Sequence, residues 1–207
     1  MKRIKLHDRC FRLMIEADVI DREIERVGTQ INRELAGERP LFLGVLNGAF
    51  MFVADLLKHI TIEGTEISFV KIASYAGLSS TGKVQDLIGL REDITGRTVV
   101  ILEDMIDSGE SIMHMKKMLE EKHPKQVKVA ALFYKPKALK YDLTIDYKCI
   151  ALENDFVVGH GLDYDGLGRN YPDLYVVDEE QMKIENEKTN SLPLRFERSA
   201  LYKQRES

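Results

Sequence analysis

The sequence is poor in residues that build disulfide frameworks or zinc sites. Cys10 and Cys149 are the only cysteines among its 207 residues, and they lie far apart in the chain. Such a pair does not indicate a disulfide framework or a zinc cluster. The five histidines also lack the spacing of metal ligands. The sequence therefore gives no sign of a transition-metal site.

A long apolar run and an excess of basic charge are missing too. The longest uncharged stretch, 40–54, contains an asparagine and two glycines and is shorter than the roughly 18 apolar residues that a membrane span needs. Charges also interrupt the first 20 residues before any signal-peptide core develops. Thirty Lys and Arg against thirty-four Asp and Glu give a net charge of −4, which provides no general attraction for nucleic acid. We therefore expect a cytoplasmic protein that binds neither membranes nor nucleic acid.

Apolar periodicity predicts an α/β fold. Apolar residues recur every three or four positions from Ile20 to Leu35, as in an amphipathic helix. Strand-like runs alternate with helix-like runs after it; the strands are expected at 41–46, 66–74, 98–105 and 127–134, and the helices at 49–60 and 111–122. Short strand-like pieces follow at 147–152, 155–158 and 174–177. This alternation predicts an open, mostly parallel twisted sheet flanked by helices.

The most informative segment is VVILEDMIDSGESI, residues 99–112. An apolar strand leads into Glu103 and Asp104, and the run from Asp107 to Ser111 opens a helix. Ligands of open parallel sheets bind beyond the carboxyl ends of the strands, and amides at a helix N-terminus with a nearby glycine can bind a phosphate. Alternatively, Asp107 and Ser108 are only helix caps and the two acids are solvated. The apolar strand and the paired acids make a phosphate site the more specific interpretation.

This segment resembles the phosphoribosyl pyrophosphate signature of the type I phosphoribosyltransferases. The usual pattern is an apolar strand, two acids, two apolar residues and then Asp-Thr-Gly-x-Thr, and here Ser108 and Ser111 replace the threonines. The resemblance implies that Glu103 and Asp104 face the ribose hydroxyls. It implies further that a turn holds the 5-phosphate; this turn consists of Asp107, Ser108, Gly109, Glu110 and Ser111. Glu110 would bind the phosphate through its backbone amide, while its side chain points outward.

Other segments resemble the hypoxanthine-guanine branch of this family. Residues 44–57 look like its pyrophosphate loop and following helix, which implies that Leu46, Asn47 and Gly48 bind pyrophosphate and that the Leu46–Asn47 peptide is cis. Asn47 stands where a Lys or Arg is often found, so backbone amides would hold the pyrophosphate. Residues 74–84, which start with Ser74 and Tyr75, resemble the mobile loop that closes over the reacting centre.

The base site is implied by two further segments. Lys135 follows the fourth strand, where the branch places a lysine that donates to the purine O6. The segment from Phe156 implies ring stacking by that residue, backbone hydrogen bonds from Val157, a Mg²⁺-bound water on Asp163 and pyrophosphate binding by Arg169. Each residue alone has a simpler explanation, as a solvated lysine, a core phenylalanine or a capping aspartate. Their common order in the chain favours the family interpretation.

The resemblance thus implies a purine salvage enzyme. It would transfer the 5-phosphoribosyl group from phosphoribosyl pyrophosphate to N9 of hypoxanthine or guanine, with Asp107 as the general base. Mg²⁺ would be the cofactor, held near Glu103, Asp104 and Asp163. Residues 1–178 would form the domain, with a small hood built from the terminal segments, in a homodimer or homotetramer. The mixed-charge segment 179–207 is expected to be a tail outside the catalytic core.

Transfer to another base and RNA binding are the alternatives to this activity. Transfer to adenine is disfavoured because a lysine cannot accept a hydrogen bond from a 6-amino group, and orotate is a further rival, whereas xanthine stays open. An RNA-binding regulator on the same scaffold, as among pyrimidine-operon attenuation proteins, would need a basic face. Neither the charge balance nor a Lys/Arg cluster indicates one.

Overall fold

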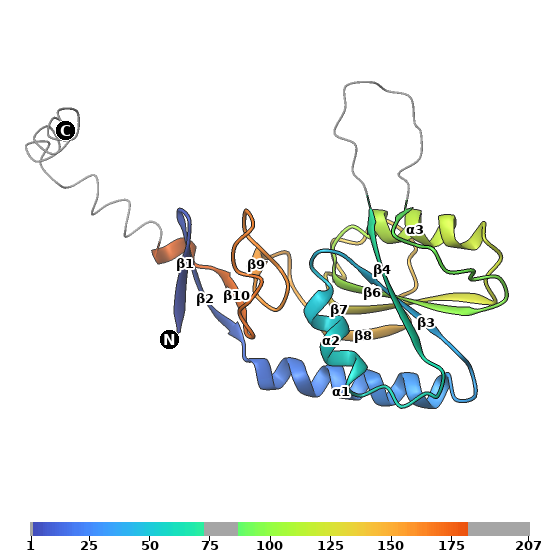
Figure 1. The fold of residues 1–207 in the computed structure, drawn as a ribbon. Coiled ribbons are helices and arrows are strands. Elements are labelled where there is room, and N and C mark those ends of the chain that lie inside the picture. Colours follow the sequence, from blue (N-terminus) through green and yellow to red (C-terminus); the bar gives the residue numbers. More distant parts are fainter. Residues whose placement is uncertain (1, 73–86, 182–207) are drawn as a thin grey trace, which may run out of the picture.

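The computed structural model describes residues 2–72 and 87–181, and these form a large and a small β-sheet (Figure 1). The large sheet has the strand order β5-β4-β3-β6-β7-β8. Five of its strands run parallel: β3 (Leu41–Val45), β4 (Glu66–Ile72), β6 (Thr98–Ile106), β7 (Gln126–Tyr134) and β8 (Tyr147–Ala151). The short β5 (Leu87–Ile88) pairs antiparallel with β4. The predicted open, mostly parallel sheet is confirmed.

Helices cover both faces of the large sheet (Figure 1). Helices α1 (Ala17–Glu34) and α2 (Phe50–Leu57) pack on one face, where side chains such as Ile24 and Phe52 share a buried cluster with Val100. Helix α3 (Glu110–Glu120) covers the other face and buries Met115 in a second cluster. Successive strand residues point to opposite faces, so a strand that is buried on both sides reads as a continuous apolar run. No helix within the described residues is both long and apolar enough to cross a membrane.

The small sheet is a hood made from both ends of the described chain. Its order is β1-β2-β10-β9, all antiparallel, and the strands are β1 (Arg3–Leu6), β2 (Arg9–Ile15), β9 (Val157–Val158) and β10 (Leu174–Val177). A buried cluster that includes Phe11, Val158 and Tyr175 lies at its centre. The expected hood of terminal segments is therefore present. The hairpin β1–β2 was not predicted, because charges interrupt its alternation and its partner β10 lies about 160 residues later.

Asp173 joins the hood to the large sheet. One carboxylate oxygen accepts the backbone N–H of Ala17, at the start of α1, at 3.0 Å. The other accepts from Lys2 Nζ at 2.5 Å and from the Tyr175 hydroxyl at 3.0 Å. The hydrogen bond from Lys2 is the main reason that the pKa of Asp173 lies below its ordinary value. This carboxylate therefore caps α1 with a side chain from the far end of the chain.

Candidate active site

The adjacent acids Glu103 and Asp104 lie near the end of β6, and both are withdrawn from water. Asp104 is 8% exposed, and Glu103 Oε2 is buried without a hydrogen-bond partner. Burial raises the pKa of Glu103 well above its ordinary value, and the neighbouring charge of Asp104 raises it further. Burial also raises the pKa of Asp104. Buried carboxyl groups with raised pKa values destabilise a fold, and they are concentrated at functional sites.

Gly48, at the end of the segment Leu46–Gly48, lies directly against Asp104 of this acid pair. A β-carbon built on Gly48 would stand only 1.6 Å from Asp104 Oδ2, so no residue larger than glycine fits without a shift. The peptide bond between Leu46 and Asn47 is cis, as expected. The Leu46 N–H donates to the Val70 carbonyl at 2.8 Å, which ties the loop to β4. The sheet therefore brings the predicted pyrophosphate loop and the predicted ribose acids together.

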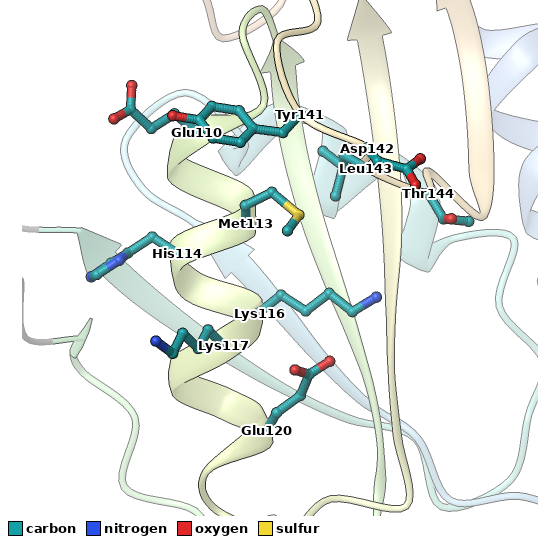
Figure 2. Close-up of a pocket in the computed structure, with 10 residues that line it drawn as sticks. All are labelled: Glu110, Met113, His114, Lys116, Lys117, Glu120, Tyr141, Asp142, Leu143 and Thr144. Atoms are coloured by element: carbon teal, nitrogen blue, oxygen red, sulfur yellow. The ribbon is translucent and has the colours of Figure 1, made fainter.

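The predicted phosphate turn occupies the connection from β6 to α3. Gly109 precedes the helix with a φ of 81°, a backbone conformation that favours glycine. The Glu110 N–H donates to Ser108 Oγ at 3.3 Å, and the Ser108 carbonyl accepts from the Lys140 N–H at 3.0 Å. The Glu110 side chain is exposed and points away from the helix, as Figure 2 shows. The first turn of any α-helix has N–H groups without helical partners, which can bind an anion.

Lys135 and Asp107 form an ion pair, with Lys135 Nζ 3.2 Å from Asp107 Oδ2. The Lys135 side chain is largely buried, at 12% exposed, whereas that of Asp107 is 60% exposed. The Lys135 N–H also donates to the Ile106 carbonyl at 2.9 Å. Strands β6 and β7 are parallel neighbours, so the residues that follow them meet at one edge of the sheet. The lysine predicted for the base and the predicted general base are thus in contact.

The hood contributes an aromatic group. Phe156 is 41% exposed, and its ring lies 5.7 Å from that of Tyr164 in an edge-on arrangement and 6.2 Å from that of Phe11. The Arg9 guanidinium lies 5.6 Å from the Phe156 ring centre. Val157 is buried and pairs with Val176 of β10. Sequence reasoning identified Phe156 but not its neighbours, because Arg9 lies in the unpredicted hairpin.

Asp163 and Arg169 bind each other. Arg169 Nη2 lies 2.6 Å from Asp163 Oδ1, and Arg169 Nη1 donates to the Gly161 carbonyl at 2.8 Å. Asp163 Oδ2 also accepts the Gly166 N–H at 2.7 Å. Within residues 2–72 and 87–181, no three His, Cys, Asp or Glu side chains gather as one metal-binding group. The three carboxylates expected around Mg²⁺ therefore do not form a single cluster. Ser74 and Tyr75, which were predicted to begin the mobile loop, lie outside the described residues.

An open hollow of about 600 Å³ lies beside α3, next to the phosphate turn. Residues of α3 and of the segment 141–144 line it, and Figure 2 shows Met113 and Lys116 pointing towards that segment. Of the predicted site residues that lie in the described part of the chain, only Glu110 lines this hollow. Its walls are mostly charged or polar surface side chains, so it is not the place where the predicted groups converge.

Comparison with known proteins agrees with this geometry. Residues 16–165 match the family model of the phosphoribosyl transferase domain. A hypoxanthine-guanine phosphoribosyltransferase of Streptococcus agalactiae is 40% identical over 169 residues, which cover 81% of this chain and 93% of that protein. The crystal structure of such an enzyme from Bacillus anthracis is 32% identical with a TM-score of 0.73, over 80% of this chain and 96% of that chain. A hypoxanthine phosphoribosyltransferase structure from Staphylococcus aureus has a TM-score of 0.74 at 29% identity, over 82% of this chain and 92% of that one. The chain therefore belongs to the phosphoribosyl transferase domain family, among the relatives of the hypoxanthine-guanine enzymes.

Proposed function

We propose that this protein transfers the 5-phosphoribosyl group from phosphoribosyl pyrophosphate to N9 of hypoxanthine or guanine, producing IMP or GMP and pyrophosphate. One observation carries the proposal. The acid pair lies near the carboxyl end of β6, the phosphate turn and Lys135 follow the parallel strands β6 and β7, and Gly48 is packed against Asp104. A ligand that joins a phosphate, a ribose and a base would need these groups at one sheet edge.

The phosphate turn and the acid pair would bind the ribose 5-phosphate part. The turn offers amides at the N-terminus of α3 and the hydroxyls of Ser108 and Ser111, all suited to a phosphate. Glu103 and Asp104 would accept hydrogen bonds from the ribose hydroxyls. Their burial supports this role, because a carboxylate that has lost water gains most from a donor on the substrate.

The leaving pyrophosphate would lie at Leu46–Gly48 and Arg169. The loop would supply backbone amides, and the guanidinium would supply the positive charge that Asn47 lacks. Arg169 is held by Asp163 and the Gly161 carbonyl. A guanidinium has five N–H donors, so some of them are left to bind an anion. Binding of the leaving group would stabilise the negative charge that develops as the bond to C1 breaks.

The adjacent acids Glu103 and Asp104 fit Mg²⁺ as the cofactor. Glu103 Oε2 is a buried oxygen without a partner, and oxygen atoms from one or two carboxylates, waters and substrate phosphates are the ligands that Mg²⁺ prefers. Glu103 and Asp104 would hold the ion on the side of the site where the ribose binds, and Asp163 would hold it through a bound water. When bound, Mg²⁺ would neutralise negative charge on the departing pyrophosphate.

The base would lie between Lys135 and Phe156. Lys135 would donate to O6, Phe156 would stack on the ring, and Val157 would present its backbone to the base edge. Asp107 would accept the proton from N7 as N9 attacks C1. Lys135 and Asp107 form an ion pair in this structure. The incoming base would either separate the two side chains or bind both at once, with O6 at Lys135 and N7 at Asp107. The segment that begins with Ser74 and Tyr75 would close over the centre and exclude water.

Location and assembly complete the proposal. We expect the protein to work in the cytoplasm as a homodimer or homotetramer, with no membrane or nucleic-acid partner. The net charge of −4 supports the absence of nucleic-acid binding.

The test is nucleotide production from phosphoribosyl pyrophosphate and Mg²⁺ with hypoxanthine, guanine, xanthine, adenine and orotate. We expect efficient IMP and GMP formation and very little product from adenine or orotate. Equal activity with adenine would contradict the base assignment, and no nucleotide from any base would contradict the proposed reaction. Omission of Mg²⁺ in the presence of a chelator should abolish turnover.

A further inference from the structure

His160 is a buried histidine that the proposed reaction does not use. It is 2% exposed, and its φ of 46° places it in the left-handed region that few residues other than glycine, asparagine and aspartate adopt. Its backbone N–H donates to the Tyr171 carbonyl at 2.7 Å. A buried polar ring in this backbone conformation requires contacts that hold it there.

Both ring nitrogens of His160 face oxygen atoms. Nδ1 lies 3.1 Å from the Pro172 carbonyl, and Nε2 lies 3.4 Å from Asp55 Oδ2 on α2. A carbonyl can only accept, so Nδ1 carries the proton. Nε2 has ion-pair distance to Asp55 but not hydrogen-bond geometry, so it has no hydrogen-bond partner. The hydrogen bond of the imidazole therefore stays within the hood loop, and the ring reaches α2 through the close approach of Nε2 to Asp55.

Asp55, the contact residue on α2, also forms an ion pair on its own helix. Asp55 Oδ1 binds Lys58 Nζ at 2.5 Å, and the carboxylate is 22% exposed. A hollow of about 480 Å³ lies beside this contact, lined by residues of α1 and α2 together with His160 and Pro172. The ring thus lies where the hood loop meets the helices that cover the large sheet.

The residue after His160 lies against the predicted pyrophosphate loop. A β-carbon on Gly161 would stand 2.1 Å from the Gly48 carbonyl oxygen. The Gly161 N–H donates to the Arg169 carbonyl at 2.9 Å, and its own carbonyl accepts from Arg169 Nη1 at 2.8 Å. A shift of His160 would therefore move Gly161, and with it both Arg169 and the surface against Gly48.

We propose that His160 is a positioning residue for the pyrophosphate side of the site. Its buried ring is hydrogen-bonded to Pro172 and packed against Asp55 of α2, and it thereby fixes where Gly161 and Arg169 lie beside Gly48. The inference rests on the proposed binding of pyrophosphate by Leu46–Gly48 and Arg169. The ring itself does not touch the substrate.

The substitution His160→Asn tests this role with little change in backbone preference, since asparagine also adopts the left-handed region but is too short to reach Asp55. His123→Asn is the matched control, because His123 is exposed and has a φ of 55° in the turn after α3. Affinities for phosphoribosyl pyrophosphate with Mg²⁺ and for GMP are measured by calorimetry. GMP shares the ribose 5-phosphate but has no pyrophosphate group.

We expect His160→Asn to weaken binding of phosphoribosyl pyrophosphate about tenfold or more, because small displacements of binding groups are costly. Its KM for this substrate should rise more than its kcat falls, while GMP affinity changes less than about threefold and His123→Asn changes neither. Asp55→Ala, which removes the side chain that His160 packs against, should have the same selective effect. The double variant should bind phosphoribosyl pyrophosphate no more weakly than the single variant with the lower affinity, because both changes break the same contact.

Two results would overturn the inference. One is unchanged affinity of His160→Asn for phosphoribosyl pyrophosphate, and the other is an equal loss of GMP affinity, which would indicate general damage to the site. Arg169→Gln separates this failure from failure of the pyrophosphate assignment. If Arg169→Gln weakens binding of phosphoribosyl pyrophosphate and His160→Asn does not, only the positioning role of His160 is wrong. If Arg169→Gln has no effect, the pyrophosphate assignment fails and the inference fails with it.

Discussion

Gly48 and Asp104 are packed so closely that the carboxylate of Asp104 occupies the space where a side chain on Gly48 would begin. A β-carbon there would lie 1.6 Å from Oδ2 and 2.4 Å from Cγ. The two residues come from neighbouring strands, since Gly48 follows β3 and Asp104 lies in β6. The contact places the predicted pyrophosphate loop within reach of the predicted ribose site.

Gly48→Ala should therefore destabilise the protein by about 1–3 kcal/mol through overpacking and weaken phosphoribosyl pyrophosphate binding. Gly48 has no positive φ that would add strain to the substitution, so the cost is steric. Urea unfolding measures the free energy change. Adding Asp104→Ala to Gly48→Ala should recover stability relative to Gly48→Ala alone, because the clashing carboxylate is gone. Equal stability of Gly48→Ala and wild type would contradict the packing described here.

Glu103→Gln should make the protein more stable at neutral pH while reducing its turnover. The pKa of Glu103 is raised on folding, so the folded state keeps the proton at pH values where the unfolded chain has lost it. The contribution of Glu103 to the free energy of unfolding should therefore fall as pH rises above the ordinary Glu pKa of about 4.3, until the folded-state pKa is passed. Glutamine does not ionise, so the variant should not show this pH-dependent loss of stability.

The expected gain is on the order of 1 kcal/mol at pH 8, or about 2–4 °C in Tm, and it should shrink towards zero near pH 4. Glu153→Gln, at an exposed carboxylate paired with Lys137, is the control and should show no such pH-dependent gain. A Glu103→Gln variant that is less stable than wild type at pH 8 would show that the carboxylate is not costly in the fold.

Lys135→Ala should lower kcat/KM for hypoxanthine and guanine about 10- to 150-fold, the range for losing a hydrogen bond to a charged donor. Binding of phosphoribosyl pyrophosphate should change little, because the lysine is assigned to O6 alone. The control is Lys137→Ala, since Lys137 is 71% exposed and its ammonium group pairs with the exposed Glu153. Full 6-oxopurine activity in Lys135→Ala would show that another group reads O6.

Asp107→Asn should lower kcat by about 10²–10⁴-fold, as expected for loss of a general base, and affect binding of phosphoribosyl pyrophosphate much less. The amide can still accept from Lys135, so the local structure should persist. Single-turnover kinetics with saturating substrates measure the chemical step. Asp142→Asn, an exposed aspartate near the same turn, is the control. A turnover close to that of wild type would remove Asp107 from proton transfer.

A chain that ends after Asp178 should keep most of its activity. The last hood strand, β10, ends at Val177, and Asp178 is already anchored by Arg3 Nε at 2.9 Å and by the Cys10 carbonyl. Activity and Tm of the shortened and full chains give the comparison. A folded, shortened protein without activity would assign residues 179–207 to the active enzyme.

Much of the large sheet and its motif could be predicted from the sequence. The segment 99–112 carries its strand, its acids and its turn in one continuous stretch, so local patterns suffice to place Glu103, Asp107 and Ser108 at a strand end. Lys135 could be placed for the same reason, because it directly follows an apolar strand. These predictions need only the alternation of strand and helix and the rule that parallel strands end at one edge.

The hood and the contacts across the site could not be predicted in this way. Periodicity tells which face of an element is buried, but it does not identify the partner that covers it. The hairpin β1–β2 pairs with β10, Asp173 caps α1, and His160 approaches Asp55 from more than 100 residues away. Local sequence patterns were sufficient to predict the parallel sheet and the residue types at its edge. Which of these residues touch depends on long-range packing, which no local pattern encodes.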